Sequence, residues 1–298
     1  MADGKILPLR AQVHPTALVS PQAQLGVGVE VGPYAVIGPD VAIGDQTVIG
    51  PHVVITGATR LGQRNRIYAG ALIGVESADR PEVPGDIPGG VRIGDDNVIR
   101  EYACIQVDRV PPPAFGGTSS PAQAGQDAPL TRIGNGNFIM AYVQVGPGCR
   151  IGNGVVITHA TALGAGVWVE DNVVISGLSS IAPGVRIGQL AMVGAVTLIQ
   201  ADVPPFLMVA GNPPQVHGIN VVGLRRHGVS PEERTKLKRA FRLLYRASRP
   251  LPDSIQELQQ EFAESALVRH LIQFLQESEH GIFQPPTPML EFPEGHEQ

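Results

Sequence analysis

Histidine is the side chain best suited to act as a general base near neutral pH, because imidazole titrates in that range. The sequence holds eight histidines. Only His159 lies in the second block of a six-residue repeat, two residues after the repeated aliphatic Ile157. At that place it could take a proton from an attacking hydroxyl group. A lone outward histidine in a repeat is more often a surface or interface residue, and both interpretations stay open.

A metal site is not predicted. Zinc chemistry on a repeat of this kind needs three converging histidines, and no such trio occurs within the repeats. The two cysteines, Cys104 and Cys149, are far apart and form no C-x-x-C pair, so neither a zinc knuckle nor a disulfide framework is indicated. We therefore expect a reducing, cytoplasmic setting and no bound cofactor.

The charge balance bears on the kind of partner. A formal net charge of -5 and an isoelectric point near 5.9 argue against an extended basic surface for nucleic acid. The N-terminal residues contain no apolar core of signal-peptide length, and every later apolar run is broken within a few positions. We expect no nucleic-acid partner and no integral membrane segment.

The elements that position these residues follow a period of six. Every sixth residue is Val, Leu or Ile over residues 13–73, 93–105 and 133–199. This period fits three short strands per coil of about 18 residues, with each repeated aliphatic pointing inward. The sequence therefore predicts an all-β fold, a left-handed parallel β-helix of hexapeptide repeats. Such prisms usually pack three around an axis, so we expect a homotrimer with sites between subunits.

Glycine follows many of the repeated aliphatics, and small or turn-forming residues crowd the corners. We expect these glycines to permit tight turns and positive φ. They are Gly26, Gly32, Gly38, Gly44, Gly50, Gly62, Gly74, Gly94, Gly134, Gly152, Gly188 and Gly194.

Two interruptions of the repeat, residues 75–92 and 107–132, are expected to leave the prism as loops. Loops on one side of a solenoid often frame a binding site, although the second one fits a disordered insertion equally well. The chain divides into an N-terminal extension (1–12), the β-helix (13–205), a short α-helical C-terminal segment (206–280) and a tail (281–298).

The C-terminal segment is predicted to contain two helices. Ser230 and Pro231 form an N-cap and a first-turn proline for a helix that reaches about Ala247. Asp253 is expected to cap a second helix that ends near Ser278.

Four segments resemble one known family. They are Val13-His14-Pro15-Thr16-Ala17, Ile99-Arg100-Glu101, Asp202-Val203-Pro204-Pro205, and the run from Gly218 to Arg226. Together they resemble the acyl-carrier-protein:UDP-N-acetylglucosamine O-acyltransferases of lipid A synthesis, members of the hexapeptide-repeat acyltransferase superfamily, over about residues 12–250. The resemblance implies transfer of an acyl chain from a carrier-protein phosphopantetheine thioester to a UDP-linked amino sugar.

In that family the general base is a histidine two residues after a repeat aliphatic and shortly before a cysteine. Pro147 occupies this position, and other family histidines fall at Gln106, Gln144, Gly166 and Ala182. Proline has no titratable group, and glutamine can hydrogen-bond a hydroxyl but is no useful base at neutral pH. The resemblance therefore implies a divergent active site, with Gln144 as a substrate contact and the base unassigned apart from His159.

Other family positions are retained. Asp79 matches a substrate-contacting aspartate, and Asn220 and Arg226 match contacts to uridine diphosphate, which arginine can hold by paired hydrogen bonds. The backbone amide of Ala165 corresponds to the donor that steadies the thioester oxyanion. The predicted helix also carries a group of cations, Lys236, Lys238, Arg239 and Arg242. They could bind an acidic carrier protein, or they could simply form a solvated face of the helix.

Two functions of different kinds fit these observations. The first is an acyltransferase of this family with a divergent active site. The second is a non-catalytic trimeric protein that binds a nucleotide sugar or the carrier protein. A metal-dependent hydratase on the same prism is a third hypothesis, which the histidine pattern does not favour. Turnover of the thioester separates the first two.

Overall fold

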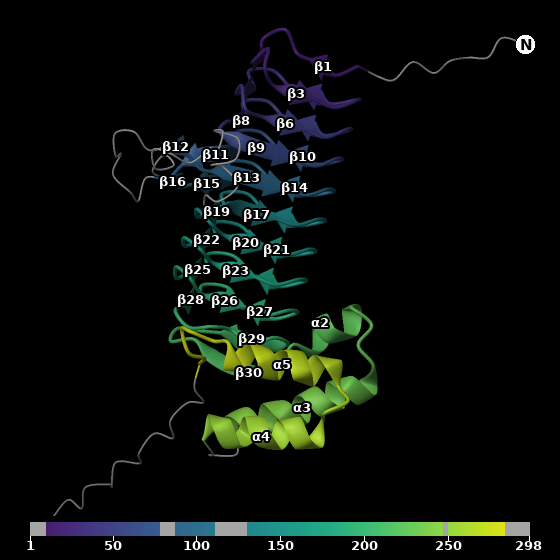
Figure 1. The fold of residues 1–298 in the computed structure, drawn as a ribbon, viewed down its shortest axis with the longest axis vertical. Helices are drawn as coiled ribbons and strands as arrows, with labels where there is room; N and C mark the ends of the chain where they lie inside the picture. The colour runs from purple at the N-terminus through teal and green to yellow at the C-terminus, as the bar shows by residue number, and fades with distance from the viewer. Residues whose placement is uncertain (1–9, 78–86, 111–129, 247–249, 284–298) are drawn as a thin grey trace, which may run out of the picture.

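The computed structural model describes residues 10–77, 87–110, 130–246 and 250–283. The chain winds into a tall three-sided prism, with a group of helices at its C-terminal end (Figure 1). Three parallel sheets form the sides, and we name them sheets A, B and C in the order in which the chain visits them. The predicted left-handed parallel β-helix is confirmed.

Most strands are two residues long, and each pairs with the strand one coil further along. Gln12 lies opposite Glu30, one 18-residue coil away. Sheet A consists of β1 (Gln12–Val13), β4 (Glu30–Val31), β7 (Val48–Ile49), β10 (Arg66–Ile67), β14 (Val98–Ile99), β18 (Phe138–Ile139), β21 (Val156–Ile157), β24 (Val174–Ile175), β27 (Met192–Val193), β29 (Leu207–Ala210) and β30 (Gln215–Ile219).

The other two sides have the same construction. Sheet B consists of β2 (Leu18–Val19), β5 (Val36–Ile37), β8 (Val54–Ile55), β11 (Leu72–Glu76), β15 (Cys104–Val107), β19 (Gln144–Val145), β22 (Ala162–Leu163), β25 (Ser180–Ile181) and β28 (Leu198–Ile199). Sheet C consists of β3 (Gln24–Leu25), β6 (Ala42–Ile43), β9 (Ala58–Leu61), β13 (Gly90–Ile93), β17 (Thr131–Ile133), β20 (Arg150–Ile151), β23 (Trp168–Val169) and β26 (Arg186–Ile187). The corners are named A–B, B–C and C–A after the sheets they join.

Two positions in each hexad point into the prism, whereas the sequence pattern predicts only one. The repeated aliphatics, such as Ile55 and Ile105, are fully buried. The residue two places earlier is buried as well, as Val53 and Asn97 show. Burying one such aliphatic side chain stabilises the fold by about 1.5–3 kcal/mol. The column of inward aliphatics is therefore the main source of stability of the prism.

Three buried asparagines, Asn65, Asn97 and Asn137, form a ladder inside the prism. The side-chain amide of Asn97 donates to Asn65 Oδ1 at 3.0 Å, and that of Asn137 donates to Asn97 Oδ1 at 2.9 Å. Asn137 Oδ1 accepts the backbone N–H of Val155 at 2.7 Å. These hydrogen bonds satisfy polar groups that would otherwise be costly inside an apolar core.

The glycines after the aliphatics serve close packing between coils, so the expectation that they supply positive φ is wrong except at Gly74. A Cβ on Gly44 would lie 2.6 Å from the carbonyl group of Gly62 in the next coil. The positive φ falls instead on the third residue after the aliphatic, for example Tyr142 at 60° and Asp96 at 58°. Tight stacking of the corners explains the glycines.

Both insertions leave the prism from sheet B, at the B–C corner of adjacent coils. The short strands β12 (Ile87–Pro88) and β16 (Arg109–Val110) belong to these insertions and pair antiparallel with each other. Arg109 also forms an ion pair with Glu76 at 3.0 Å. The two insertions are therefore joined at their bases, on the same side of the prism.

The C-terminal segment begins with a hairpin instead of a helix. β29 and β30 pair antiparallel, and β29 continues sheet A beside β27, so the sheet extends past the last hexad. The helices are α2 (Val221–Arg226), α3 (Pro231–Tyr245), α4 (Leu251–Glu261) and α5 (Ala266–Gln276). None of the helices within the described residues combines the length and apolarity needed to span a membrane.

The predicted helix at 231–247 is confirmed as α3, with Ser230 Oγ accepting the N–H of Glu233 at 3.2 Å. The predicted single helix from Asp253 to Ser278 is wrong. The chain forms α4 and α5 there, because Ser265 accepts the N–H of Val268 at 3.3 Å and starts a new helix. Asp253 lies in the first turn of α4, whose N-cap is Pro250.

The helices close the open end of the prism with a second apolar cluster. Phe206 and Leu190 from the last coil pack with Leu224, Leu258 and other buried residues of the helices. A polar link adds to this contact, since His270 Nε2 of α5 lies 2.7 Å from Glu170 Oε2 at the end of β23. The terminal coil is thus covered instead of exposing an unpaired edge.

Candidate active site

The turn after β19, residues 146–148, is the place where the family resemblance puts the base. It lies at the B–C corner, between Gln144 of sheet B and Arg150 of sheet C. Pro147 is buried there, and its carbonyl accepts the N–H of Gly166 from the next coil at 2.8 Å. The structure thus places a non-titratable residue at this position.

Two glutamines lie beside this turn on adjacent strands of sheet B. Gln144 is exposed, Gln106 is 9% exposed, and Gln144 Nε2 donates to Gln106 Oε1 at 3.3 Å. The pair offers amide donors and carbonyl acceptors that can orient a hydroxyl group, but neither side chain can take up a proton at neutral pH. The structure therefore brings Gln106, Gln144 and Pro147 together, as the resemblance implies.

Thr131 ties this turn to the preceding coil. Its Oγ1 donates to the Gln106 carbonyl at 2.7 Å and accepts the N–H of Gly148 at 3.0 Å. Cys149 follows, buried, with Sγ 3.1 Å from the Gly164 carbonyl. Burial raises the pKa of Cys149 to about 12, so it remains a thiol and is not a nucleophile here.

Ala165 occupies the same B–C corner one coil further along, after β22. The N–H groups on either side of it are used, because Gly164 donates to Ile181 at 2.9 Å and Gly166 donates to Pro147 at 2.8 Å. Ala165 is an exposed residue, and its N–H has no acceptor among the described residues. A backbone donor in this state can stabilise negative charge on a thioester oxygen.

His159 lies on a different corner. It follows β21 of sheet A and so belongs to the A–B corner, where it is exposed. It is near Glu101, whose pKa is lowered first by its hydrogen bond to Arg100 and to a smaller degree by His159. The structure therefore does not bring His159 to the Gln144 corner within one chain.

Asn220 and Arg226 lie at the two ends of α2, Asn220 as the N-cap residue and Arg226 as the last residue of the helix. Asn220 is buried; its Nδ2 donates to the Leu190 carbonyl at 2.8 Å and its Oδ1 accepts the N–H of Gly223 at 2.9 Å. Asn220 thus caps α2 and fixes it to the last coil. Arg226 is exposed and has no partner among the described residues. Asp79 lies outside the described residues.

The predicted carrier-protein dock on α3 is partly neutralised. Lys236 lies 2.9 and 2.8 Å from carboxylates of Glu232 and Glu233. Arg239 lies 3.4 Å from Glu261. Lys238 and Arg242 are exposed, and the structure shows no ion pair for either within the described ranges.

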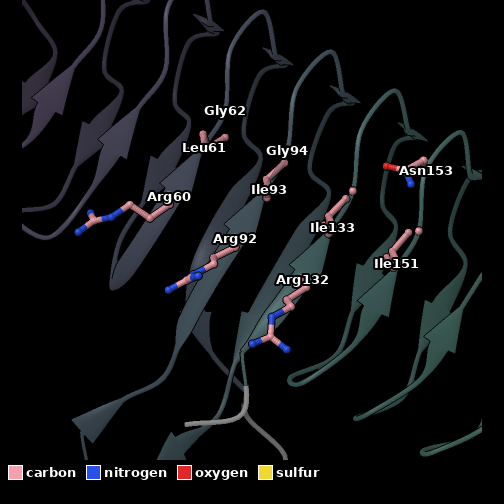
Figure 2. A pocket seen from close by; sticks show the side chains of 12 residues that line it. Arg60, Leu61, Gly62, Arg92, Ile93, Gly94, Arg132, Ile133, Ile151 and Asn153 are labelled. Carbon is pink, nitrogen blue, oxygen red and sulfur yellow. The ribbon is translucent and has the colours of Figure 1, made fainter. Parts of the chain in front are cut away.

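A column of arginines on sheet C is absent from the sequence-based predictions. Arg60, Arg92, Arg132 and Arg150 lie side by side on adjacent strands, each one residue before an inward aliphatic. Figure 2 shows the first three pointing to the same side of the sheet. Arg60, Arg92 and Arg132 border an open hollow of about 600 Å³. The pattern is not apparent in the sequence, because the two insertions make the spacing between these arginines along the chain unequal.

Comparison with known proteins finds similarity to one enzyme family over nearly the whole chain. A family model described as UDP-N-acetylglucosamine O-acyltransferase, domain 2, matches residues 202–283. A model of the bacterial transferase hexapeptide repeat matches residues 22–57 and 130–165. Both the prism and the helical end are therefore covered.

Two similar curated proteins carry the name acyl-[acyl-carrier-protein]–UDP-N-acetylglucosamine O-acyltransferase. The protein from Halorhodospira halophila is 42% identical over 271 residues, covering 91% of this chain and 98% of that protein. The one from Myxococcus xanthus is 43% identical over 272 residues, covering 91% and 99%.

Solved structures agree with these sequence matches. The UDP-N-acetylglucosamine acyltransferase of Francisella novicida superposes with a TM-score of 0.81 at 30% identity, covering 96% of this chain and 100% of that one. The UDP-N-acetylglucosamine O-acyltransferase of Moraxella catarrhalis gives a TM-score of 0.82 at 30% identity, covering 91% and 99%.

Proposed function

The chain belongs to the family of acyl-[acyl-carrier-protein]–UDP-N-acetylglucosamine O-acyltransferases, and we propose that it transfers an acyl chain from a carrier-protein thioester to a UDP-linked amino sugar. The observation that carries this proposal is the similarity to such enzymes across nine-tenths of the chain, 42% identity in one case. The donor's phosphopantetheine belongs to the carrier protein, so this chain needs no cofactor of its own.

In the proposed reaction a sugar hydroxyl or amine attacks the thioester carbonyl, the C–S bond breaks, and the carrier protein leaves as a thiol. The free N–H of Ala165 supports the oxyanion of the tetrahedral intermediate. Gln144 and its partner Gln106 orient the attacking group. The proton passes to the leaving sulfur or to solvent, because Pro147 cannot accept it. Loss of a positioned base slows such reactions by about 10²–10⁴-fold.

The acceptor's uridine diphosphate is assigned to Arg226, whose guanidinium is exposed and uncommitted. Asp79 lies outside the described residues and is kept as a substrate contact on the family resemblance alone. Asn220 contributes by fixing α2 to the prism. UDP-sugars and acyl thioesters are cytoplasmic metabolites, and two free cysteines fit a reducing compartment. The proposal therefore places the protein in the cytoplasm.

A homotrimer is part of this proposal, supported by the apolar character of two sides. The A–B corner exposes large apolar side chains, with Tyr142 63%, Leu178 68% and Val196 63% exposed. Leu198 of sheet B and Val48 of sheet A are 47% and 37% exposed. Apolar surface of this extent is typical of a subunit contact. A threefold contact through sheets A and B would cover it and leave the charged sheet C in solvent.

A second function remains in view because of one specific observation. Among the described residues, the side chains that line the B–C corner at Gln106, Gln144 and Pro147 are not titratable at neutral pH. This corner therefore suits a trimeric protein that binds a nucleotide sugar or carrier protein without turnover.

The test is release of free carrier-protein thiol from acyl and hydroxyacyl carrier proteins, with and without UDP-N-acetylglucosamine. We expect slow, sugar-dependent release by the wild type and an increase of about a hundredfold or more in Pro147→His, which restores a base at the turn. Absence of release from both proteins, with UDP-N-acetylglucosamine binding intact by calorimetry, would favour the binding protein over the enzyme.

A further inference from the structure

We propose that the acidic acyl carrier protein binds to the outward face of sheet C. It docks along the column formed by Arg60, Arg92, Arg132 and Arg150. This inference rests on the proposed function, because it identifies where the acyl donor binds. It assigns the dock to the prism, next to the B–C corner, instead of to the helices at the C-terminal end.

The four arginines occupy equivalent positions on adjacent strands of sheet C. Arg60 pairs in register with Arg92, Arg92 with Arg132, and Arg132 with Arg150. Adjacent strands lie about 4.8 Å apart, so the row spans about 14 Å. All four residues are exposed. Figure 2 shows the long side chains of Arg60, Arg92 and Arg132 extending together from the sheet.

These arginines lack carboxylate partners within the described ranges, and Arg150 lies over the Trp168 ring, 6.0 Å from its centroid. Arg60 donates to a backbone carbonyl, that of Asp40, at 3.0 Å. Elsewhere Arg64 lies 2.7 Å from Asp96, and Arg100 lies 2.9 Å from Glu101.

Like charges directly opposite each other on adjacent strands destabilise a sheet. The chain carries a formal net charge of -5, so this row is not a by-product of an overall basic composition. An unneutralised row of this kind is suited to an anionic partner.

The row ends beside the candidate site. Arg150 is three residues after Pro147, on the other side of the same turn. A carrier protein held on sheet C can therefore extend its flexible phosphopantetheine arm around the B–C corner toward Gln144 and Ala165. The cations of α3 are less available, because Lys236 and Arg239 are already paired with glutamates.

The geometry of the row favours a helix as the occupant. Carboxylates on successive turns of an α-helix are about 5.4 Å apart, close to the spacing of about 4.8 Å between the arginines. A single acidic helix laid along the row can pair with all four.

A broad anionic surface fits poorly, because Asp95, Asp96 and Asp171 occupy the adjacent C–A corner. They would repel a bilayer or a nucleic acid that extended beyond the row. We therefore assign the surface to the acidic protein.

The test compares two variants of the full-length protein. Arg92→Gln/Arg132→Gln/Arg150→Gln removes the centre of the row, and Lys238→Gln/Arg242→Gln removes the unpaired cations of α3. Binding of holo acyl carrier protein is measured by fluorescence anisotropy at low and at high salt. We expect the triple variant to bind about tenfold or more weakly at low salt and to lose most of the salt dependence, and the α3 variant to bind like the wild type.

Thermal unfolding shows whether the triple variant is correctly folded. Because the triple variant relieves repulsion between like charges, we expect its midpoint temperature to equal or exceed that of the wild type. In the thiol-release assay its KM for the acyl carrier protein rises while its KM for UDP-N-acetylglucosamine stays unchanged.

Three results would overturn the inference: wild-type binding by the triple variant, loss of binding only in the α3 variant, or no carrier-protein binding by the wild type. Capture of the wild type, but not the triple variant, by anionic lipid vesicles in preference to carrier protein would assign the row to a membrane instead. The binding assay does not require turnover. A wild type that binds the carrier protein through this row but releases no thiol supports the dock and contradicts the proposed acyl transfer.

Discussion

At the scale of single residues, a hexad sets where a side chain points but leaves its chemistry free. Pro147 and Ala165 occupy equivalent places two residues after an inward aliphatic of sheet B, on adjacent coils. His159 occupies the same place after sheet A. The same hexad position therefore holds a non-titratable proline and a proposed oxyanion donor at the B–C corner, and an exposed histidine at the A–B corner.

This reasoning gives a prediction for His159. Because it lies on the A–B corner, away from Gln144 and Pro147, we expect His159→Ala to change kcat of thiol release by less than about threefold, whereas removal of a true base costs about 10²–10⁴-fold. The measurement is kcat with saturating acyl carrier protein. A loss of a hundredfold or more, together with a lost pH dependence near neutrality, would show that His159 reaches the corner of a neighbouring subunit.

At the scale of elements, the buried asparagine ladder is a point where the prism depends on hydrogen bonding. Asn97 is fully buried and its Oδ1 accepts two bonds from Asn137, from the backbone N–H and from Nδ2, each at 2.9 Å. Asn97→Ala leaves both donors of Asn137 unpaired inside the core. We expect a loss of about 2–4 kcal/mol in the free energy of unfolding.

Asn135 provides the matched control for this prediction. It makes similar bonds to the next coil, to Asn153 Oδ1 at 2.8 and 3.1 Å, but it is exposed, so water can replace them. Asn135→Ala is expected to cost less than about 1 kcal/mol. Urea titration followed by circular dichroism measures both. Equal losses in the two variants would contradict the role assigned to burial.

The elements also show what the sequence can predict. A single period of six is sufficient to predict the sheets, the inward aliphatics and the three-sided coil, because each hexad repeats one local structure. The split between α4 and α5 was missed, since the cap at Ser265 interrupts an otherwise continuous apolar pattern. Asn65 and Asn97 were not recognised as core residues, because buried amides are visible only through their partners.

The candidate site was predictable in part. Gln106, Gln144, Pro147 and Ala165 share the B–C corner, and the hexad register with the family resemblance is enough to place them there. The arginine row needs the three-sided geometry, because its members recur once in each coil and two insertions separate Arg60, Arg92 and Arg132. The pairing of Lys236 and Arg239 with glutamates depends on side-chain contacts, partly with α4.

At the scale of the whole molecule, the sides of the prism differ in the surface that they present to other molecules. Sheets A and B and the corner between them carry most of the exposed large apolar side chains, whereas sheet C carries the arginine row and one such side chain, Trp168. The proposed subunit contact and the proposed dock for the carrier protein thus use different sides. The B–C corner lies where these two surfaces meet. A thioester delivered over sheet C would enter the edge of the subunit contact, where a second chain can help to exclude water.

The trimer itself is tested at the A–B corner. Leu178 and Val196 have positive φ of 58° and 55°, a conformation that Asp96 also adopts in this protein at 58°. Aspartate therefore fits these corners without backbone strain, and its charge opposes burial between subunits. We expect Leu178→Asp/Val196→Asp to sediment as a single chain of 31.5 kDa, while the wild type sediments as three.

The control is Asn172→Asp, which puts the same charge at the same kind of turn, with φ of 59°, but on the C–A corner. We expect it to remain trimeric. Circular dichroism should show an intact prism in both variants, because each substitution lies outside the core. If the A–B variant stays trimeric while Asn172→Asp dissociates, the subunit contact lies at the C–A corner. The arginine row would then border that contact, and the carrier protein would have to bind elsewhere.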